Sequence, residues 1–257
     1  MRVYLDYAAT TPLDPEVREA MREVEGVFGN PSSVHRFGQE ARKVLEGARE
    51  KVAALLKARP REVVFTASGS EADALALLGV ALARGRGHVV STAVEHSALL
   101  GALGLLERLG FAVTRLKPDR HGLVYPEQVK EALREDTFLV SVMAANNELG
   151  TLYPIREIAE VAHAHGALFH TDAVQAIGQV PFSLEEVGAD LASLSAHKFY
   201  GPKGIGALLV RQGVELFPLV PGKQEGGRRG GTQSPVLAHG LAVALEKAFR
   251  RLPEEME

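Results

Sequence analysis

The segment Ile155-Arg-Glu-Ile-Ala-Glu-Val-Ala-His-Ala-His165, followed closely by Ala167-Leu-Phe-His-Thr171, decides the fold class. Its first part has the apolar spacing of a helix, and its second part is a short apolar run typical of a buried strand. The same alternation recurs along the whole chain. It predicts strands at 63–65, 88–92, 112–116, 139–143, 167–171, 191–195 and 206–210, and helices at 34–55, 71–83, 98–109, 155–165 and 234–251.

Strands that alternate with helices predict an α/β fold. Because the strands are almost continuously apolar, we expect a mostly parallel sheet with helices on both faces, which gives three layers. Residues 212–233 are rich in glycine and proline and predict a long loop. In sheets of this kind the ligand site forms at the carboxyl ends of the strands. The side chains that follow each strand are therefore the candidates for function.

Composition narrows the class of protein. The 257 residues are 46% hydrophobic and 24% charged with a net charge of −3, which is typical of a soluble globular protein. This balance favours neither nucleic acid nor a membrane surface as the main partner. No apolar run approaches the roughly 18 residues of a membrane span, and the first residues do not resemble a secretory signal, so we expect a cytoplasmic protein. The absence of cysteine excludes disulfides, thiolate metal sites and a cysteine nucleophile within this chain.

The loop after the first predicted strand is a candidate anion site. It reads Thr66-Ala-Ser-Gly-Ser-Glu71 and opens a helix. The first backbone N–H groups of a helix lack partners, and its dipole favours negative charge there. The alternative is ordinary helix capping by Ser68 or Ser70. Polar side chains also follow the later strands, namely His96, Asn147, Asp172, Gln175, Ser195, His197 and Lys198.

Together these side chains offer an amine, a carboxylate and several phosphate-binding donors. A pyridoxal-phosphate site needs this set, because a lysine condenses with the aldehyde and an acidic partner keeps the pyridine nitrogen protonated. The pKa of that lysine should lie well below its free value of about 10.4. A metal site built from His163, His165, His170 and Asp172 is the competing hypothesis. On a helix, residues i and i+2 do not share a face, so we predict no metal site.

Several motifs, in register along almost the whole chain, resemble those of the cysteine desulfurases, in the class V aminotransferase group of fold-type I pyridoxal-phosphate enzymes. They are Tyr4-Leu-Asp-Tyr-Ala-Ala-Thr-Thr-Pro12, Phe28-Gly-Asn-Pro-Ser-Ser33 with His35, Glu95-His96, Asn146-Asn-Glu-Leu-Gly150, His170-Thr-Asp-Ala-Val-Gln175 and Ser195-Ala-His-Lys-Phe-Tyr-Gly-Pro-Lys-Gly204. The resemblance implies the large domain of a fold-type I enzyme with pyridoxal 5′-phosphate as its cofactor.

The resemblance also implies roles around the cofactor ring. Lys198 would form the Schiff base, Asp172 would pair with the pyridine nitrogen, and Gln175 would bond the ring hydroxyl. His96 would stack on the ring and take part in proton transfer. Asn147 would lie near the ring hydroxyl and the substrate carboxylate.

At the other end of the cofactor, Gly69, Ser70, Ser195 and His197 would hold the phosphate. Thr232 would reach the phosphate of a neighbouring subunit, which implies a homodimer. The family usually carries threonine at the position of Ser70, where serine keeps the hydroxyl. It usually carries asparagine at the position of Ala74, and the effect of that change is not evident from the sequence.

The resemblance divides the chain into a cofactor-binding large domain, residues 1–251, and the start of a small domain, residues 252–257. In the family the small domain supplies the cysteine that takes up sulfur and an arginine that binds the substrate carboxylate. Both lie beyond what this sequence contains, which favours a fragment, a truncated product or half of a split enzyme. We therefore expect the chain to bind the cofactor but to release sulfur slowly or not at all by itself.

The activity implied is conversion of cysteine to alanine and sulfur, with a sulfur-acceptor protein as partner and iron–sulfur cluster assembly as destination. Two alternatives stay open. One is another pyridoxal-phosphate reaction, such as selenocysteine lysis, β-elimination or transamination, which needs no protein thiol. The other is a non-catalytic scaffold subunit that kept the fold and lost the chemistry.

Overall fold

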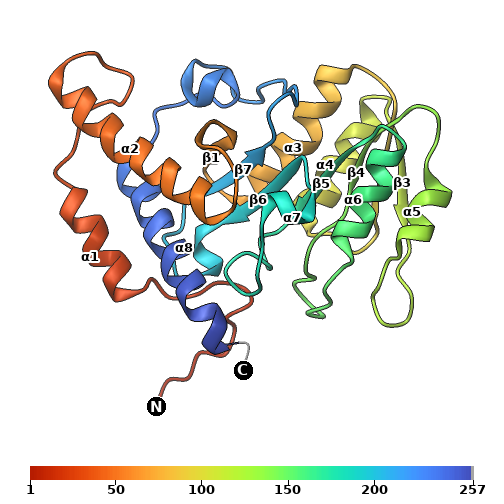
Figure 1. Ribbon diagram of the computed structural model, residues 1–257, viewed down its shortest axis with the longest axis horizontal. Helices are drawn as coiled ribbons and strands as arrows, with labels where there is room; N and C mark the ends of the chain where they lie inside the picture. Colours follow the sequence, from red (N-terminus) through yellow and green to blue (C-terminus); the bar gives the residue numbers. More distant parts are fainter. Residues whose placement is uncertain (256–257) are drawn as a thin grey trace.

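The computed structural model describes residues 1–255 and is built around one seven-stranded sheet (Figure 1). The strand order is β1-β7-β6-β5-β4-β2-β3. Among the described strands, β7 alone runs in the opposite direction to the other six, and it pairs antiparallel with β1 and β6. The strands are β1 (Val63–Thr66), β2 (His88–Thr92), β3 (Ala112–Leu116), β4 (Thr137–Ser141), β5 (Leu168–Asp172), β6 (Leu191–Ser195) and β7 (Gly206–Val210).

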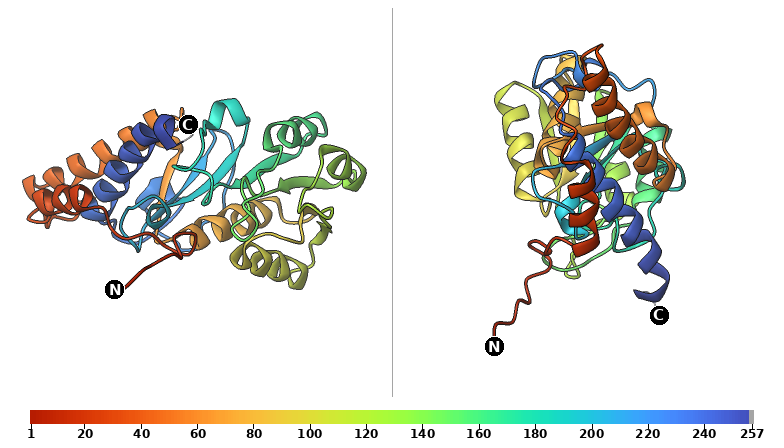
Figure 2. Two further views of the ribbon diagram at one scale, coloured as in Figure 1. Left: turned by 90° about the horizontal axis from the view of Figure 1, so that it is seen from below. Right: turned by 90° about the vertical axis from the view of Figure 1, so that its left-hand side faces the viewer.

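Helices cover both faces of the sheet, as the view from below in Figure 2 makes clear. They are α1 (Pro15–Val24), α2 (Arg36–Leu55), α3 (Gly69–Arg84), α4 (Ser97–Arg108), α5 (Pro126–Ala132), α6 (Ile155–Ala164), α7 (Leu184–Val187) and α8 (Pro235–Glu255). Short 3₁₀ turns occur at Pro60–Glu62, Ala196–Lys198 and Gln224–Gly227. One apolar cluster joins α3 and α4 to one face, and a second joins the other helices to the opposite face.

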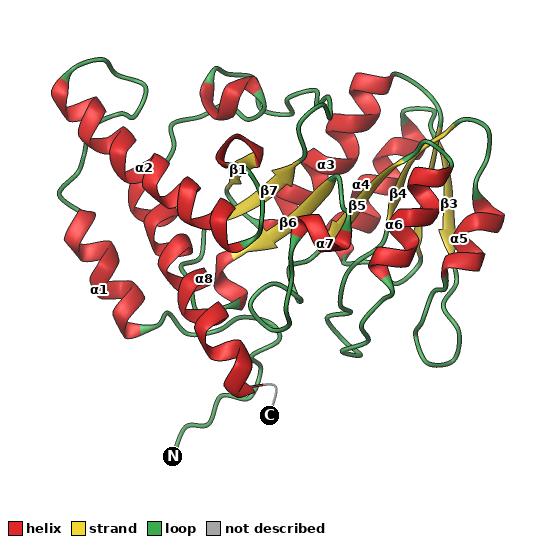
Figure 3. Cartoon of the chain, viewed as in Figure 1, coloured by secondary structure: helices red, strands yellow, loops and turns green. Residues whose placement is uncertain are grey.

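The residues of the strands explain why the sheet lies in the interior. Every residue of β1, β2, β4, β6 and β7 is buried, whereas each residue of β3, at one edge, is only partly buried. Strands covered on both faces cannot alternate polar and apolar residues, so their sequences are near-continuous apolar runs. The yellow strands in Figure 3 accordingly lie between two layers of helices.

The predicted fold class is confirmed: the sheet is mostly parallel, has helices on both faces and contains all seven predicted strands. The bounds of β4 differ most from the predicted strands. The apolar run predicted β4 at 139–143, but its ladder begins two residues earlier, because Thr137 pairs with His88. The structure also contains three helices that were not predicted, namely α1, α5 and α7.

Helix α1 carries sequence signals that the prediction overlooked. Asp14 caps this helix by accepting the N–H groups of Glu16 and Val17 at 2.8 and 3.3 Å, and Pro15 starts it. Val17, Ala20, Met21 and Val24 recur at the spacing of one helix face, although only Val17 among them is fully buried. The helix therefore forms mainly through its cap and through packing against α8.

Helix α8 spans the point at which two domains were predicted to meet. It continues without a break from Pro235 to Glu255, so a division between residues 251 and 252 stays a prediction. Within residues 1–255, no helix is both long and apolar enough to cross a membrane.

Candidate active site

A cavity of about 190 Å³ lies where the carboxyl ends of the strands meet. Nine of the ten residues predicted to contact a cofactor line it: Gly69, Ser70, His96, Asn147, Asp172, Gln175, Ser195, His197 and Lys198. Asp172 and Ser195 end β5 and β6, and the others lie in the segments that follow β1, β2, β4, β5 and β6. Because parallel strands end at the same edge of a sheet, residues more than a hundred positions apart are brought together there.

Thr232 is the predicted residue that the cavity does not include. It lines a separate cavity of about 240 Å³, together with Thr66, Ala67 and Arg229. Arg229 binds Glu71 through Nε and Nη2 at 2.7 and 3.1 Å. This ion pair connects the start of helix α3 to the loop of residues 212–233, which carries Thr232 and is called the glycine-rich loop below.

The amino-terminal end of α3 forms one end of the cavity. Ser68 caps the helix by accepting the N–H of Glu71 at 3.1 Å, and Ser68, Gly69 and Ser70 all line the cavity. A Cβ added at Gly69 would lie 2.8 Å from Val174 Cγ2 and 3.2 Å from Ser195 Cβ. The main chain at position 69 therefore lies so close to Val174 that any side chain there would force a shift. Ser68 caps the helix while the start of α3 still lines the cavity, so the two sequence interpretations do not exclude each other.

The backbone of Gly206, at the start of β7, supports the same helix end. A Cβ added there would lie 2.7 Å from the carbonyl carbon of Ser68 and 2.9 Å from the Gly69 nitrogen. It would also lie 2.6 Å from the carbonyl oxygen of Leu194, in β6. Three stretches of main chain thus meet at one glycine.

Lys198 ends the 3₁₀ turn that follows β6, and its amino group points toward the amino-terminal segment of the chain. Its Nζ donates to the carbonyl oxygens of Ala8 and Ala9, the latter at 2.9 Å. Burial lowers the pKa of Lys198, while the negative charges of Asp172 and Asp6 oppose that shift. The uncharged amine that attacks a carbonyl is therefore more accessible than in a free lysine.

Asp172 ends β5 with only 4% of its surface exposed. Its Oδ1 accepts the N–H of Val174 at 2.9 Å. Burial raises the pKa of Asp172, and the hydrogen bond from Val174 and the positive charge of Lys198 work against that rise. A buried carboxyl group and a lysine amine thus face the same cavity and interact electrostatically across it.

Hydrogen bonds orient the remaining polar side chains. His96 caps α4, since its Nδ1 accepts the N–H of Ala98 at 3.2 Å. The Nδ1 of His197 lies 3.0 Å from Thr10 Oγ1, and burial lowers the pKa of His197. Gln175 donates to the carbonyl oxygen of Ala8 at 3.0 Å, and Asn147 donates to its neighbour Glu148 at 2.8 Å.

The histidines considered as metal ligands lie in separate hydrogen-bond networks. His163 binds Asp190 Oδ2 at 2.7 Å, and His165 binds the carbonyl oxygen of Arg134 at 2.6 Å. His170 lies between Ser141 Oγ at 2.8 Å and Ser193 Oγ at 3.0 Å. In the part of the chain that the structure describes, no group of three or more potential ligands is arranged to hold a metal ion.

Sequence reasoning missed several groups at this site. Asp73 lines the cavity, as do Ala9 and Met143, and Glu95 is buried close to Asp172. One signal for Asp73 was available, because it stands four residues after Gly69 and so lies on the same helix face one turn further on. No comparable signal marks Ala9, which reaches the site through the fold of the amino-terminal segment.

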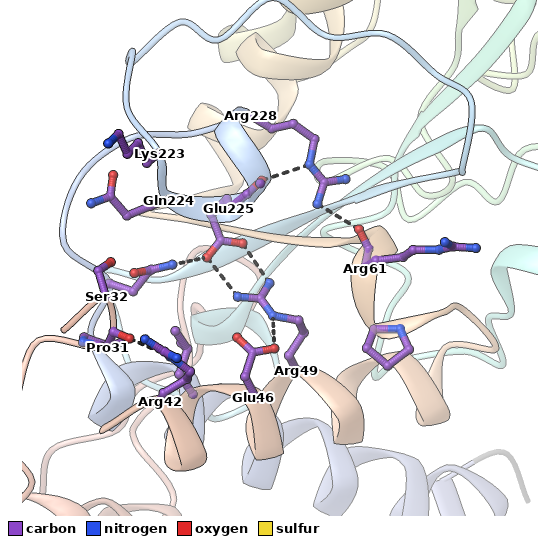
Figure 4. A pocket seen from close by; sticks show the side chains of 14 residues that line it. Pro31, Ser32, Arg42, Glu46, Arg49, Arg61, Lys223, Gln224, Glu225 and Arg228 are labelled. Carbon is purple, nitrogen blue, oxygen red and sulfur yellow. Dashed lines mark hydrogen bonds and ion pairs between the residues drawn. The ribbon is translucent and has the colours of Figure 1, made fainter. Parts of the chain in front are cut away.

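A second pocket, of about 540 Å³, lies between α2 and the glycine-rich loop (Figure 4). At its base Arg49 donates to Glu225 through two nitrogens at 2.7 and 3.0 Å. Glu225 also accepts the N–H of Phe65 at 3.0 Å. This pocket shares no lining residue with the cavity around Lys198. The ion pair between Arg49 and Glu225 holds the loop against α2, and neither residue lines the cavity around Lys198.

Comparisons with known proteins agree with this geometry. The family model described as Aminotransferase class-V matches residues 3–229. The chain is 48% identical to "Cysteine desulfurase IscS" of Dictyoglomus turgidum over 260 residues, which covers 99% of the chain and 66% of that protein. It is 48% identical to "Putative cysteine desulfurase IscS 1" of Bacillus subtilis, of which it covers 69%.

Solved structures give the same result. A "NIFS-LIKE PROTEIN" superposes with a TM-score of 0.96 at 43% identity, covering 99% of the chain and 71% of that structure. A structure described as "SspA in complex with cysteine" superposes with a TM-score of 0.93 at 44% identity, covering 95% and 72%. The chain therefore spans about two thirds of the length of the curated relatives that it matches.

Proposed function

The chain belongs to the class V aminotransferase family, and from that premise we propose that it binds pyridoxal 5′-phosphate at Lys198 and acts on cysteine to give alanine and sulfur. The single observation that carries the proposal is the position of Lys198 and Asp172 in one cavity, beside the open end of α3. Relatives named cysteine desulfurase and a structural neighbour in complex with cysteine support this substrate.

The residues present fit this cofactor. When bound, pyridoxal phosphate supplies an aldehyde that an amine can capture and a ring that withdraws electrons from the substrate. Lys198 would hold the aldehyde end, since burial favours its uncharged amine. Asp172 would hold a proton on the ring nitrogen, and Gln175 would bind the ring hydroxyl.

The backbone and side chains around α3 suit the phosphate. Gly69 and Ser70 would bind it from the helix end, where N–H groups and the dipole favour anions. Ser195 and His197 would bind it from the loop after β6. A side chain at position 69 would crowd Val174 and Ser195, which is consistent with a site that needs close approach of the backbone.

His96 and Asn147 would act on the substrate side of the cavity. The Nδ1 of His96 already accepts a backbone N–H, so the ring is held in place and its Nε2 would move the proton. Asn147 would bind near the ring hydroxyl and the substrate carboxylate. We propose in addition that Thr232 completes the phosphate site of a second copy of the chain, which makes the active species a homodimer.

Sulfur transfer needs a thiol that these 257 residues do not contain. Transfer from cysteine to a thiol R–SH gives alanine and R–S–SH, in which the C–S bond of cysteine breaks, an S–S bond forms and the substrate carbon gains a proton. The thiol therefore has to come from outside these residues. We propose that a cytoplasmic acceptor protein then takes the sulfur for iron–sulfur cluster assembly.

The proposal is tested by adding pyridoxal phosphate to the purified chain and recording the visible spectrum. We expect a yellow protein whose absorption band is lost in Lys198→Ala and kept in Lys203→Ala, a control on the same loop. Reduction with borohydride should then fix the cofactor to Lys198, as located by mass spectrometry. A colourless protein that ignores the cofactor would overturn the assignment and favour a scaffold role.

Substrate choice is tested on the yellow protein. Free cysteine is itself a thiol, so the comparison is made at one low cysteine concentration, at which we expect little alanine. With a small-molecule thiol added in excess, a second thiol reduces the persulfide, R–S–SH and R–SH giving R–S–S–R and H₂S, so alanine and sulfide should form in equal amounts. Alanine formation that the added thiol does not accelerate would contradict the need for an outside thiol. Faster turnover of selenocysteine than of cysteine under both conditions would favour a selenocysteine lyase.

A further inference from the structure

Three carboxyl groups are buried beneath the cavity, although the proposed function uses only one of them. Asp73, Glu95 and Asp172 are 1%, 5% and 4% exposed. Asp172 ends β5, Asp73 lies in the second turn of α3, and Glu95 stands in the loop after β2. Burying a carboxylate without a positive partner costs free energy. It therefore matters, for each of these groups, whether it is protonated at neutral pH.

Asp73 is in contact with polar groups but with no cation. Its side chain lines the same cavity as that of Asp172, on a helix packed against β6, and hydrogen bonding with Asp172 and Ser193 contributes to its pKa. Its Oδ1 has no hydrogen-bond partner and lies 3.7 Å from the Nε2 of His170. Burial lowers the pKa of His170 to about 3, so at neutral pH that ring carries no charge to balance a carboxylate.

Two adjacent buried carboxyl groups cannot both be ionised at neutral pH, and they therefore share a proton. The surroundings decide which one keeps it. Asp172 accepts the N–H of Val174 and is close to the positive charge of Lys198. Asp73 has none of these partners. The negative charge thus settles on Asp172 and the proton on Asp73.

Glu95 does not compete for the charge. Its Oε1 accepts from Thr92 Oγ1 at 2.8 Å and from the N–H of Met143 at 3.1 Å, while its Oε2 has no partner. Burial raises the pKa of Glu95 to about 8, so it is mostly protonated at neutral pH. Of the three carboxyl groups, Asp172 is then the one that is ionised.

We propose that Asp73 is a positioning residue that holds a proton and donates it in a hydrogen bond to Asp172, so that Asp172 stays ionised against the ring nitrogen of the cofactor. This inference rests on the proposed function, because the ring nitrogen is the group that Asp172 would face. Asp73 itself acts through Asp172 and need not touch the substrate.

Asparagine and alanine at position 73 separate hydrogen bonding from ionisation. Asp73→Asn keeps the shape, cannot ionise, can donate N–H to Asp172 and can accept from Ser193. Asp73→Ala removes the donor. A hydrogen bond to a charged group contributes roughly 1.5–3 kcal/mol, so its loss should move the equilibrium of the proton between ring nitrogen and Asp172 by about tenfold to a hundredfold.

The readout is the ¹⁵N chemical shift of pyridoxal phosphate labelled at its ring nitrogen and bound to each variant. We expect the shift of a protonated pyridine in the native protein and in Asp73→Asn, and a displacement toward the neutral value in Asp73→Ala. An unchanged shift in Asp73→Ala would overturn the proposal. Equal displacement in both variants would also overturn it, because ionisation rather than donation would then matter.

A second readout needs no cofactor and still decides the question if Asp73→Ala fails to fold. Infrared spectra of the cofactor-free protein at neutral pH should show the C=O stretch of a buried carboxylic acid that Asp73→Asn abolishes. Glu95→Gln is the matched control and should remove a different component. If Asp73→Asn removes no such band, the assigned proton is wrong even where the cofactor binds normally; if only cofactor binding fails, the proposed function is at fault instead.

Discussion

The Nζ of Lys198 lies 2.9 Å from the carbonyl oxygen of Ala9 and donates a hydrogen bond to it, although 189 positions separate the two residues. The amino-terminal segment therefore forms one wall of the cavity and holds the amine in place. Gln175 binds the same segment through the carbonyl oxygen of Ala8. The amine must leave these carbonyl oxygens when it reacts, and its pKa decides how readily it does so.

The first prediction concerns the titration of this amine. Because burial lowers the pKa of Lys198, the uncharged form should appear at a lower pH than in an unfolded chain. We expect reductive labelling by pyridoxal phosphate and borohydride to reach half of its maximum at lower pH for Lys198 than for a peptide spanning residues 195–201. Coincident curves for protein and peptide would argue against a perturbed amine.

A second prediction concerns Asp172→Asn. Asparagine keeps the shape but cannot balance a positive ring nitrogen, so the cofactor should still bind while its electron withdrawal weakens. We expect exchange of the α-proton of alanine for deuterium, followed by NMR, to slow by about 100-fold or more. Glu160→Gln, an exposed change on α6, should leave the exchange rate as it is. Native exchange in Asp172→Asn would remove Asp172 from the ring.

The third prediction tests the buried pair Arg49–Glu225, whose side chains are 8% and 0% exposed. Arg49→Ala leaves the Glu225 carboxylate buried without its cation, so the free energy of unfolding should fall by about 3–5 kcal/mol. Arg36 pairs with Glu40 in the open, with 88% and 48% exposed, and Arg36→Ala should cost less than about 0.5 kcal/mol. Urea titrations of both variants measure the difference. Similar losses for the two would mean that Glu225 is held by its other partners.

Glu95 gives the fourth prediction, through the pH dependence of stability. Its pKa rises from an ordinary 4.5 to about 8 in the folded chain, so between these values the folded state binds more protons than the unfolded one. The contribution of Glu95 is therefore fully present below about pH 4.5 and is lost as the pH rises toward 8. The slope is at most about 1.4 kcal/mol per pH unit.

Glu95→Gln removes this titration and keeps the oxygen that accepts from Thr92 and Met143. In the cofactor-free protein, its stability relative to the native chain should rise steadily from pH 5 to pH 8. Other titrating groups, including His170, are common to both proteins and cancel in the difference. Stability curves that run parallel across this range would show that Glu95 titrates normally.

The fifth prediction compares two glycines. Gly69→Ala places a methyl group 2.8 Å from Val174 Cγ2, inside the cavity wall. Overpacking of this kind costs about 1–3 kcal/mol, so we expect cofactor affinity to fall by roughly fivefold to a hundredfold. At Gly47, on the exposed side of α2, an added Cβ meets nothing within 4 Å. Gly47→Ala should raise stability by up to about 1 kcal/mol and leave affinity unchanged, as fluorescence titrations can measure.

Much of the fold was predictable because the strands are buried on both faces. A mostly apolar run such as Leu191-Ala-Ser-Leu-Ser195 is stable only in the interior of the sheet. The parallel arrangement then brings the segments that follow the strands to one edge of the sheet. The set that lines the cavity followed from that one geometric rule. Helix α1 was predictable but was overlooked, because Asp14 and Pro15 mark its start and Val17, Ala20, Met21 and Val24 have helical spacing.

The groups missed at the site share a physical reason. Ala9 reaches the cavity only because the amino-terminal segment folds back across it, and an alanine carries no chemical signal. Asp73 is polar but lies in a helix rich in Ala and Leu, where a single carboxyl group is expected to face solvent. Its burial comes from the packing of α3 against β6 and β7, which is a property of the folded structure.

The contact at Gly206 bears on how this architecture can change. Main-chain atoms set the distance between the start of α3 and β6 here. Substitutions among the surrounding side chains can therefore accumulate without changing that distance. A single methyl group at this position would act as a wedge and push the two apart. In a saturation library, position 206 should therefore be among the least permissive in the chain, although its residue presents no functional group at all.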